Sequence, residues 1–348
     1  MNQTKALIAM SGGVDSSVAA YLAKKDGFAC VGATMKLHPT PQQSDDAAAV
    51  ARRLGIPFHV LDFQKEFRQY VMDAFVQDYE NGLTPNPCVV CNQKLKFGCL
   101  MDAATELGCQ YVVTGHYARV AQMGATGRWV LKKALDESKD QSYFLYGLTQ
   151  AQLSRILFPL GELTKDAVRQ IALEQGFVNA KKKDSQDVCF IPDGDYPAFM
   201  IRHTGKTYPA GDFLDCTGNV VGHHKGAVCY TVGQRKGLGL AVGEPVYVCD
   251  KDMAKNTVTV GPNESLMRTS LRADRWFWHT IPELTEPMRV MAKARSRMTE
   301  QPATVYPEEN GLARVEFDEP QRAITPGQAV VLYDGDTIVG GGTITEVL

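Results

Sequence analysis

The stretch that decides the fold is Ser11-Gly12-Gly13-Val14-Asp15-Ser16-Ser17. It lies between the apolar run 7–10 and the helix-like run 18–23, so the pattern predicts a strand, a tight turn and a helix. Adjacent glycines let the backbone bend sharply and approach a ligand closely, and the amide groups at a helix start attract anions. The turn therefore indicates a phosphate site. The plainer alternative is a turn in which Asp15 or Ser16 caps the helix.

The N-terminal half of the chain alternates strand and helix patterns. Strand patterns cover 5–10, 29–35, 58–63 and 111–114, and helical patterns cover 16–25, 45–54, 66–79 and 95–107. This order predicts a doubly wound α/β fold, in which a parallel sheet carries helices on both faces and binds ligands at the carboxyl ends of its strands. Met35 ends the second strand at that edge and Gly115 follows the fourth, so both are expected beside a nucleotide, although Met35 could equally belong to the core.

The pattern changes towards the C-terminus. Helical patterns continue at 148–158 and 165–174, and short β-branched runs follow at 228–232 and 246–248. Evenly spaced strand patterns then occupy 288–294, 303–306, 313–317, 329–333 and 337–339, which predicts a small β-barrel. We expect three domains: a doubly wound domain at 1–204, a small central α+β domain at 205–268, and the barrel at 269–348.

Composition excludes several classes of protein. A formal charge of −2 over 348 residues excludes a uniformly basic nucleic-acid binder but leaves room for local basic patches. No apolar stretch is long enough to span a bilayer, and the first residues have no signal-peptide layout. Nine cysteines, an odd number, indicate reduced thiols rather than a disulfide framework, so we expect a cytoplasmic protein without a membrane partner.

The second motif is a C-x-x-C pair. Cys88 and Cys91 lie within Thr84-Pro85-Asn86-Pro87-Cys88-Val89-Val90-Cys91-Asn92, and Cys189 lies far downstream. The two prolines fix the course of this segment, so we expect a rigid loop that presents its thiols.

Three interpretations of these thiols compete. A structural zinc site would need Cys99 or Cys109 as further ligands, at a spacing that no familiar zinc ribbon has. Ordinary packing of unrelated thiols is the second interpretation. In the third, one thiol carries a persulfide and another resolves it, and the basic run at 181–183 helps to hold Cys189 as a thiolate.

The turn at 11–17 is similar to the S-G-G-x-D-S loop of the PP-loop ATP pyrophosphatases, which adenylate an oxygen and release pyrophosphate. Further motifs at 84–92, 115–119, 139–145, 183–190 and 230–239, with Gly340-Gly341-Gly342, follow in the order found in the bacterial tRNA-specific 2-thiouridylases, the MnmA/TrmU family. The chain resembles this family over nearly its whole length. The resemblance implies an ATP-binding catalytic domain, a central tRNA-contacting domain and a tRNA-binding barrel.

The resemblance also implies the reaction. ATP would adenylate the C2 oxygen of the wobble uridine in the tRNAs for Lys, Glu and Gln, and sulfur would then displace AMP to give 2-thiouridine. Activation is needed because an amide-like carbonyl oxygen is a poor leaving group, and Mg²⁺ would neutralise the phosphates. A cysteine desulfurase or a sulfur-relay protein would donate the sulfur. The target base has to leave the anticodon stack to reach the enzyme.

By the same resemblance, individual residues receive roles. The ATP site would comprise Ala9, Met10, Ser11, Gly12, Gly13, Val14, Asp15, Ser16, Met35 and Gly115. Cys189 would receive the persulfide and Cys91 would be its partner thiol. The flipped base would meet Asn86, Pro87 and Cys88, and other parts of the tRNA would meet His116, Lys139, Asp140, Gln141, Arg295, Ser296 and Gln328.

A basic pattern in the predicted barrel also favours RNA binding. Lys293, Arg295 and Arg297 alternate along one predicted strand, so their side chains would share one face. Such a face would bind phosphates. The alternative is an edge strand guarded by charge.

One residue departs from the family pattern. Some members have Asp where this chain has Cys88, and a thiol cannot act as that carboxylate would at neutral pH. Cys88, Cys91 and Cys189 could instead hold an iron–sulfur cluster whose open iron carries a sulfide. The persulfide relay and the cluster both remain open. So do two other functions: a small-molecule ligase that uses the same ATP loop, and a tRNA-binding nucleotide sensor without catalysis.

Overall fold

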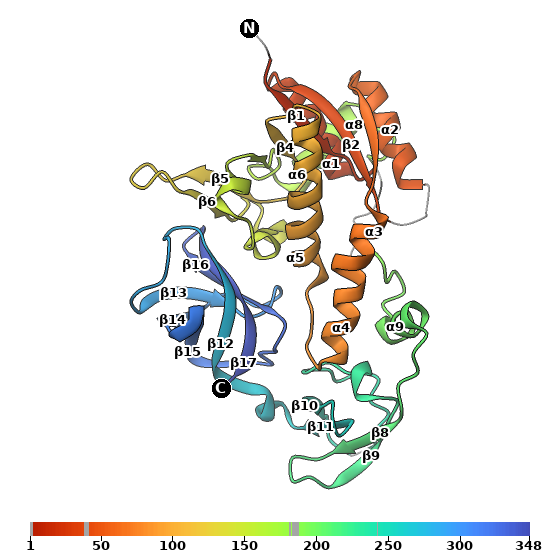
Figure 1. Ribbon diagram of the computed structural model, residues 1–348, viewed down its shortest axis with the longest axis vertical. Coiled ribbons are helices and arrows are strands. Elements are labelled where there is room, and N and C mark those ends of the chain that lie inside the picture. Colours follow the sequence, from red (N-terminus) through yellow and green to blue (C-terminus); the bar gives the residue numbers. More distant parts are fainter. Residues whose placement is uncertain (1–2, 38–41, 181, 183–187, 242) are drawn as a thin grey trace.

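Three sheets organise the molecule (Figure 1). The computed structural model describes residues 3–37, 42–180, 182, 188–241 and 243–348. A five-stranded parallel sheet lies at the N-terminal end, a closed barrel is formed by the C-terminal strands, and a four-stranded sheet lies between them in sequence. Among the described residues, no helix is long and apolar enough to cross a membrane.

The parallel sheet has the strand order β3-β2-β1-β4-β7. Its strands are β1 (Lys5–Ala9), β2 (Ala29–Lys36), β3 (Phe58–Asp62), β4 (Tyr111–Val113) and β7 (Ile156–Leu157). Leu7 and Ile8 are fully buried on opposite faces, as expected for a sheet covered on both sides. The four strands predicted from the sequence are therefore confirmed.

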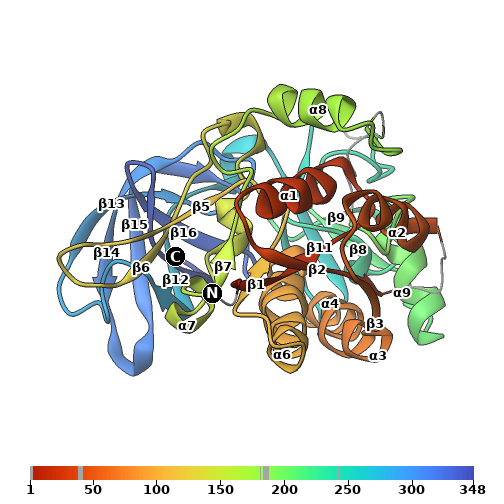
Figure 2. The ribbon, with the colours of Figure 1, turned by 90° about the horizontal axis from the view of Figure 1, so that it is seen from above.

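Helices cover both faces of this sheet (Figure 2). One layer contains α1 (Val14–Lys25), α2 (Gln42–Leu54) and α8 (Lys165–Glu174). On the opposite side lie α5 (Pro87–Cys91), the π-helical η2 (Asn92–Cys99) and α6 (Leu100–Glu106), and η2 and α6 pack on the sheet. The helices α3 (Gln64–Phe67), η1 (Arg68–Asp73, π-helical) and α4 (Ala74–Glu80) continue from the sheet to the central domain and share its core (Figure 1). The doubly wound fold predicted from the alternating pattern is confirmed.

Two local predictions in this domain were wrong. The segment predicted as one helix at 148–158 contains only α7 (Gln150–Leu153) and then the strand β7. A short apolar run fits a buried strand as well as a helix, so periodicity could not separate the two. The expected loop around Cys88 is in fact a helix, because Pro87 stands at the first helical position, where its missing N–H costs nothing.

The barrel is closed and antiparallel. Its strands are β12 (Met267–Trp278), β13 (Met288–Lys293), β14 (Gln301–Pro307), β15 (Ala313–Arg322), β16 (Ala329–Asp334) and β17 (Thr337–Val347). They follow the order β12-β15-β14-β13-β16-β17, and β12 pairs with β17 to close the ring. The predicted barrel is confirmed, and β12 is the strand that the sequence pattern missed.

The central sheet is mixed. It has the order β10-β11-β8-β9, with β8 (Gly211–Leu214), β9 (Val220–His224), β10 (Tyr247–Asp252) and β11 (Thr257–Gly261), and β11 runs parallel to β8. Helix α9 (Tyr196–Thr204) precedes it. The β-branched run at 228–232 is not a strand: its first residues belong to the 3₁₀ turn η5 (Ala227–Cys229), and Val228, Cys229 and Tyr230 are buried in the core.

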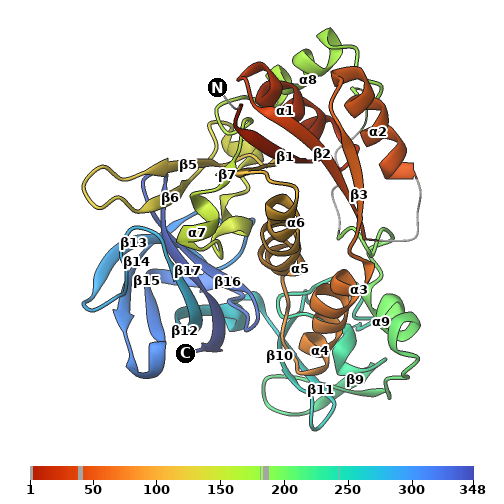
Figure 3. The same cartoon turned by 45° about the horizontal axis from the view of Figure 1, so that its top comes forward.

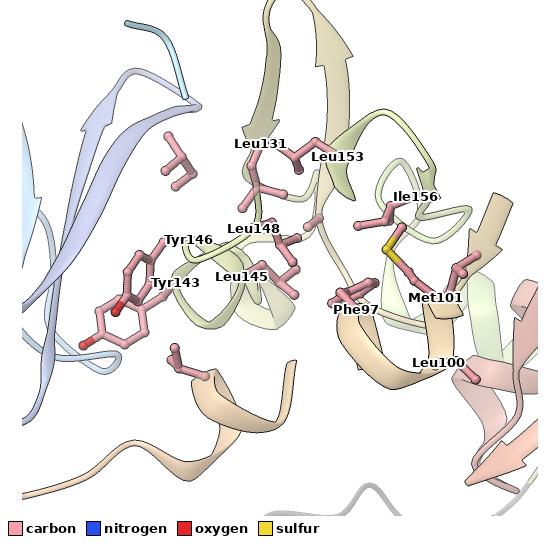
Figure 4. Packing of buried hydrophobic residues seen from close by; sticks show 14 of the residues in the cluster. Phe97, Leu100, Met101, Leu131, Tyr143, Leu145, Tyr146, Leu148, Leu153 and Ile156 are labelled. Atoms are coloured by element: carbon pink, nitrogen blue, oxygen red, sulfur yellow. The ribbon is translucent and has the colours of Figure 1, made fainter. Parts of the chain in front are cut away.

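A shared core fixes the barrel against the N-terminal domain. A hairpin of β5 (Arg119–Gln122) and β6 (Trp129–Lys132) adds to β17 of the barrel sheet. Figure 4 shows the packing, in which Tyr143 and Tyr146 point towards the barrel while Phe97 and Met101 lie beside the parallel sheet. The Tyr143 hydroxyl donates to the Ala329 carbonyl at 2.9 Å. Figure 3 gives a second view of this contact between domains. The division at 204/205 and 268/269 stays a prediction.

Candidate active site

The phosphate loop is a compact turn between β1 and α1. Gly12 has φ of 74°, a left-handed conformation that favours glycine. The Ser11 amide donates to the Ser16 hydroxyl at 3.2 Å, and the Ser16 and Ser17 hydroxyls each donate to the Gly13 carbonyl at 3.0 Å. Gly13 is the N-cap residue and no side chain caps the helix, so the alternative of a cap by Asp15 or Ser16 was wrong.

Gly115 lies directly against this loop. A Cβ added there would stand 2.7 Å from the Asp15 carbonyl carbon and the Ser16 nitrogen, so only glycine permits the approach. The Met10 side chain is buried below Gly32, whereas Met35, near the carboxyl end of β2, is half-buried and packs partly against the core, so its predicted place beside the nucleotide stays a prediction. The predicted ATP residues of the turn therefore lie together with Gly115, whereas Met10 could contribute only backbone atoms to the ATP site.

Three polar residues support the loop, and two of them, Lys165 and Asn179, lie outside the motifs identified in the sequence. The Lys165 ammonium, which is 7 % exposed, donates to both Asp15 carboxylate oxygens at 2.7 and 2.9 Å. The Tyr117 hydroxyl donates to Asp15 at 2.9 Å, and the Asn179 amide donates to the Gly12 carbonyl and the Ser17 hydroxyl. A glycine turn and a helix start together fit the phosphates of a nucleotide, and the Asp15 carboxylate carries oxygens of the kind that Mg²⁺ prefers.

The three candidate thiols converge from two segments. Cys88 and Cys91 lie on α5, whose N-cap residue is Asn86. Cys189 precedes Phe190, whose ring packs 5.7 Å from Phe67 and 5.3 Å from Phe75, and Cys91 belongs to the same core. Cys88 and Cys189 are exposed, whereas Cys91 is buried. The structure therefore brings Cys189 within electrostatic reach of Cys88 and Cys91, about a hundred residues away in sequence.

Desolvation by the surrounding protein is the largest influence on these thiols, although Cys88 and Cys189 keep an exposed side. Desolvation raises the pKa of Cys88, Cys91 and Cys189, and for Cys189, with the neighbouring thiols adding to it, the value reaches about 11. The charge of Lys96 acts in the opposite direction on all three. In the apo chain the thiols are therefore mostly protonated at neutral pH.

Lys96 is held in place by a buried histidine. Its Nζ lies 3.3 Å from His116 Nε2, and His116 Nδ1 lies 2.7 Å from the Thr114 hydroxyl. Burial first, and the Lys96 charge second, lower the pKa of His116 well below its usual value. The imidazole is thus neutral and accepts from Lys96 through Nε2. The sequence suggested that the lysines at 181–183 stabilise the Cys189 thiolate. Lys182 instead donates to the Asp46 carboxylate at 2.9 Å, and residues 181 and 183 lie outside the described residues.

The described side chains do not form a metal site. Within the described ranges, no group of three or more His, Cys, Asp or Glu side chains is arranged to hold a metal ion. The zinc interpretation was wrong for these residues, since Cys109 lies near Cys30 and Lys5 at the amino ends of the strands, and the charges that reach Cys99 are those of Glu66 and Asp102. Cys88, Cys91 and Cys189 do not form such a group in the described conformation, so an iron–sulfur cluster on these three thiols stays a prediction.

The residues assigned to tRNA by resemblance make contacts within the chain. Asp140 accepts from the Ala134 amide at 2.9 Å and from the Ser142 hydroxyl at 2.7 Å. Gln141 Oε1 accepts from the Tyr117 amide at 2.9 Å, and Lys139 ends the 3₁₀ turn η3 (Glu137–Lys139). These bonds fix the segment that follows Gly115 and His116.

The predicted basic stripe of the barrel was wrong. Strand β13 ends at Lys293, so Arg295, Ser296 and Arg297 lie in the turn that follows and do not alternate along a strand. Arg295 Nη2 donates to the Val232 carbonyl at 3.0 Å and to the Thr325 hydroxyl at 2.6 Å. Gln328 donates to the backbone at Thr84 and Pro85.

Comparisons with known proteins cover the whole chain. Residues 4–193 match the model of the tRNA methyl transferase HUP domain, 198–262 that of the tRNA methyl transferase PRC-barrel domain, and 268–344 that of the aminomethyltransferase beta-barrel domain. The tRNA-specific 2-thiouridylase MnmA of Clostridioides difficile is 45% identical over 99% of both chains. That of Clostridium acetobutylicum is 46% identical over 98% of this chain and 99% of the relative.

A solved structure of a 4-thiouridine synthetase–RNA complex with bound ATP is similar at 17% identity and a TM-score of 0.37, covering 58% of this chain and 50% of that one. The identity to these relatives extends over the full length of the chain, and all three domain matches agree with it. The chain belongs to the family of tRNA-specific 2-thiouridylases.

Proposed function

We propose that this enzyme uses ATP to replace the C2 oxygen of a tRNA uridine with sulfur. One observation carries the proposal: adjacent residues connect the phosphate loop to the thiols. Gly115 packs on the backbone of Asp15 and Ser16, and His116 holds Lys96, whose charge reaches Cys88, Cys91 and Cys189. An activated oxygen and a sulfur nucleophile can therefore meet in one place, as a two-stage substitution requires.

The loop residues support the activation step. When ATP is bound, the amides at the start of α1 and the Lys165 ammonium would hold its phosphates. Asp15 would supply one oxygen ligand to a Mg²⁺ ion that also binds the phosphates. The uridine oxygen would attack the α-phosphorus and pyrophosphate would leave, so that AMP becomes the leaving group at C2. Backbone amides and one buried cation can stabilise the charge that develops on the phosphates.

The thiols support the sulfur step. Cys189 is exposed and could receive a terminal sulfur from a donor protein as a persulfide, whereas Cys91 is buried beside it. The terminal sulfur would attack C2 and AMP would leave. The Cys91 thiolate would then attack Cys189 Sγ, which forms a Cys91–Cys189 disulfide and releases 2-thiouridine. An external dithiol would reduce the disulfide and return both thiols.

Finer details stay predictions. These are the wobble position, the tRNAs for Lys, Glu and Gln, a cysteine desulfurase or relay protein as donor, and a cytoplasmic location. The iron–sulfur alternative on Cys88, Cys91 and Cys189 also stays a prediction. A small-molecule ligase or a non-catalytic sensor would account for fewer of the observed features, since neither function needs thiols beside an ATP-binding loop.

The decisive experiment is ATP-dependent 2-thiouridine formation on a tRNA-Glu transcript under anaerobic conditions, with a persulfide donor, before and after iron removal. We expect equal activity in both samples, and at least a hundredfold loss for Cys91→Ser and Cys189→Ser. Cys216→Ser, which changes an exposed thiol of the central domain, is the matched control and should keep full activity.

Other outcomes would redirect the proposal. Activity that disappears with iron, returns on reconstitution and is lost in Cys88→Ser would favour the cluster. Exchange between ATP and pyrophosphate without tRNA would favour a ligase. Binding of tRNA without thiolation, unaffected by loss of Cys189, would favour the sensor.

A further inference from the structure

The barrel holds the backbone directly ahead of the thiol helix, by which we mean residues 87–99. Residues 325–328, between β15 and β16, form a turn that we call the latch turn. Gln328 Nε2 donates to the Thr84 carbonyl at 2.9 Å and to the Pro85 carbonyl at 3.3 Å. In return, the Thr84 amide donates to the Pro326 carbonyl at 2.9 Å. Three hydrogen bonds thus join segments that are more than 240 residues apart.

The contact is also tightly packed. Gly327 has φ of 89°, and a Cβ built on it would lie 2.9 Å from the Thr84 nitrogen and 3.0 Å from the Thr84 oxygen. Thr84 and Pro85 are buried. Neither a side chain at 327 nor a shift of the Thr84 backbone can be accommodated without separating the two surfaces.

The latch turn is itself anchored on the barrel. The Gly327 amide donates to the Ile344 carbonyl and the Ile344 amide donates to the Gln328 carbonyl, each at 2.8 Å. The Thr325 hydroxyl accepts from Arg295 at 2.6 Å, and Arg295 also reaches the Val232 carbonyl of the central domain. The turn therefore presents Gln328 from a rigid support.

The position of this contact links it to the thiols. Pro85 is followed by Asn86, the N-cap residue, and helix α5 begins at Pro87. Only Asn86 separates the held carbonyl from the first helical residue, so a fixed Pro85 fixes the start of the helix that carries Cys88 and Cys91. Both prolines restrict the chain further, since each locks its own φ.

We propose that the latch turn positions the thiol helix, and that Gln328 is a positioning residue for the sulfur chemistry in addition to any contact with RNA. The inference deepens the proposed function and rests on it. The amide nitrogen of Gln328 has two hydrogens, and both are directed at backbone carbonyls of the chain. The barrel is then part of the active-site framework rather than a separate RNA-binding appendage.

The first test needs neither tRNA nor ATP. The full-length enzyme is treated with N-ethylmaleimide, and the alkylation rate of each cysteine is followed by peptide mass spectrometry. In Gln328→Ala we expect Cys91 to be alkylated about fivefold faster or more, as loss of a hydrogen bond implies. Gln328→Glu should increase the rate further, because its carboxylate would face two carbonyl oxygens. The exposed Cys216 and the buried Cys30 should not change, so a general loosening would be visible.

A matched glycine pair provides a second, independent variant. Gly327→Ala places a methyl group against Thr84, whereas Gly335→Ala, also at positive φ and with open space around it, does not. We expect faster alkylation of Cys91 only in Gly327→Ala. An unchanged Cys91 rate in both Gln328→Ala and Gly327→Ala, or an equal rise at Cys30, would overturn the proposal.

Kinetics separate positioning from RNA binding. A positioning role predicts that Gln328→Ala lowers kcat for 2-thiouridine formation at least about fivefold with little change in KM for tRNA. A higher KM with unchanged kcat and unchanged alkylation would leave Gln328 as an RNA contact alone and overturn the inference. If the wild-type enzyme forms no 2-thiouridine, the proposed function fails, and the alkylation experiment still decides whether the latch turn holds the helix.

Discussion

Lys96 is the residue whose charge reaches all three active-site thiols. It follows Cys88 and Cys91 on the thiol helix, and the neutral imidazole of His116 accepts from it. Burial opposes ionisation of the thiols and Lys96 favours it. A persulfide or thiolate formed here would thus have a fixed cation beside it, without the lysine run at 181–183 that the sequence suggested. The buried His116 that holds Lys96 is itself held by Thr114, whose hydroxyl lies 2.7 Å from His116 Nδ1.

Replacing Lys96 should therefore slow the thiol chemistry. In Lys96→Met the pKa of Cys91 and Cys189 should rise further, because the cation that favours the thiolate is gone. At pH 8 the thiolate fraction and the alkylation rate should fall about threefold. Lys94→Met, an exposed lysine of the same helix, is the control and should alkylate like the wild type. Equal rates for Lys96→Met and the wild type would remove Lys96 from the site.

At the scale of elements, the site depends on how closely β4 and the segment after it approach α1. Gly115 is the point of contact, since its Cα lies against the backbone of the phosphate loop. Tyr117, two residues further along the same segment, and Lys165, at the start of α8, then bind Asp15. The loop is thus shaped before any nucleotide arrives, which lowers the entropic cost of binding.

Gly115→Ala should disrupt this arrangement. The added methyl group would push the loop away, and overpacking of this kind costs about 1–3 kcal/mol. We expect ATP to bind tenfold more weakly or worse, measured by calorimetry with the intact enzyme. Gly124→Ala in the β5–β6 hairpin, where nothing lies within 4 Å, should bind ATP like the wild type. Normal ATP affinity in Gly115→Ala would show that the loop is not the nucleotide site.

The elements also show what the sequence could and could not predict. The strand–turn–helix at 11–17 and helix α8 followed from periodicity and helix-start signals, and both are observed. Strand β7 was hidden in an apolar run too short to show alternation. The helix at Cys88 was hidden by two prolines, which fit a loop and a helix start equally well.

At the scale of the whole molecule, the decisive contacts join distant segments. Asp15 meets Lys165, and Gln328 meets Thr84, and no local pattern contains either pair. Motifs could name candidate thiols and loop residues because their chemistry is local. Their supporting partners depend on tertiary packing, which only the fold reveals. The interface between the barrel and the N-terminal domain, where both share one core, is another of these hidden features.

The stability of that interface should depend on pH through the buried side chain of His279. It is 1 % exposed at the end of β12, where the Arg128 guanidinium of the hairpin donates to its carbonyl at 2.8 Å. Burial, with the Arg128 charge adding to it, lowers the pKa of His279 to about 4. Between pH 6.5 and 4 the unfolded chain binds a proton there and the folded chain does not, so the free energy of unfolding falls as pH falls.

From pH 7 to pH 5 this group alone should remove about 2 kcal/mol of barrel stability. The stacked pair Trp276 and Trp278 lies beside it, so urea unfolding followed by tryptophan fluorescence reports the relevant region. In His279→Gln the difference between the two pH values should shrink by that amount, whatever the variant's absolute stability. Part of the difference should persist, because burial lowers the pKa of His116 too. His223→Gln, an exposed histidine, should leave the difference intact. An unchanged pH dependence in His279→Gln would mean that this interface does not exclude the proton.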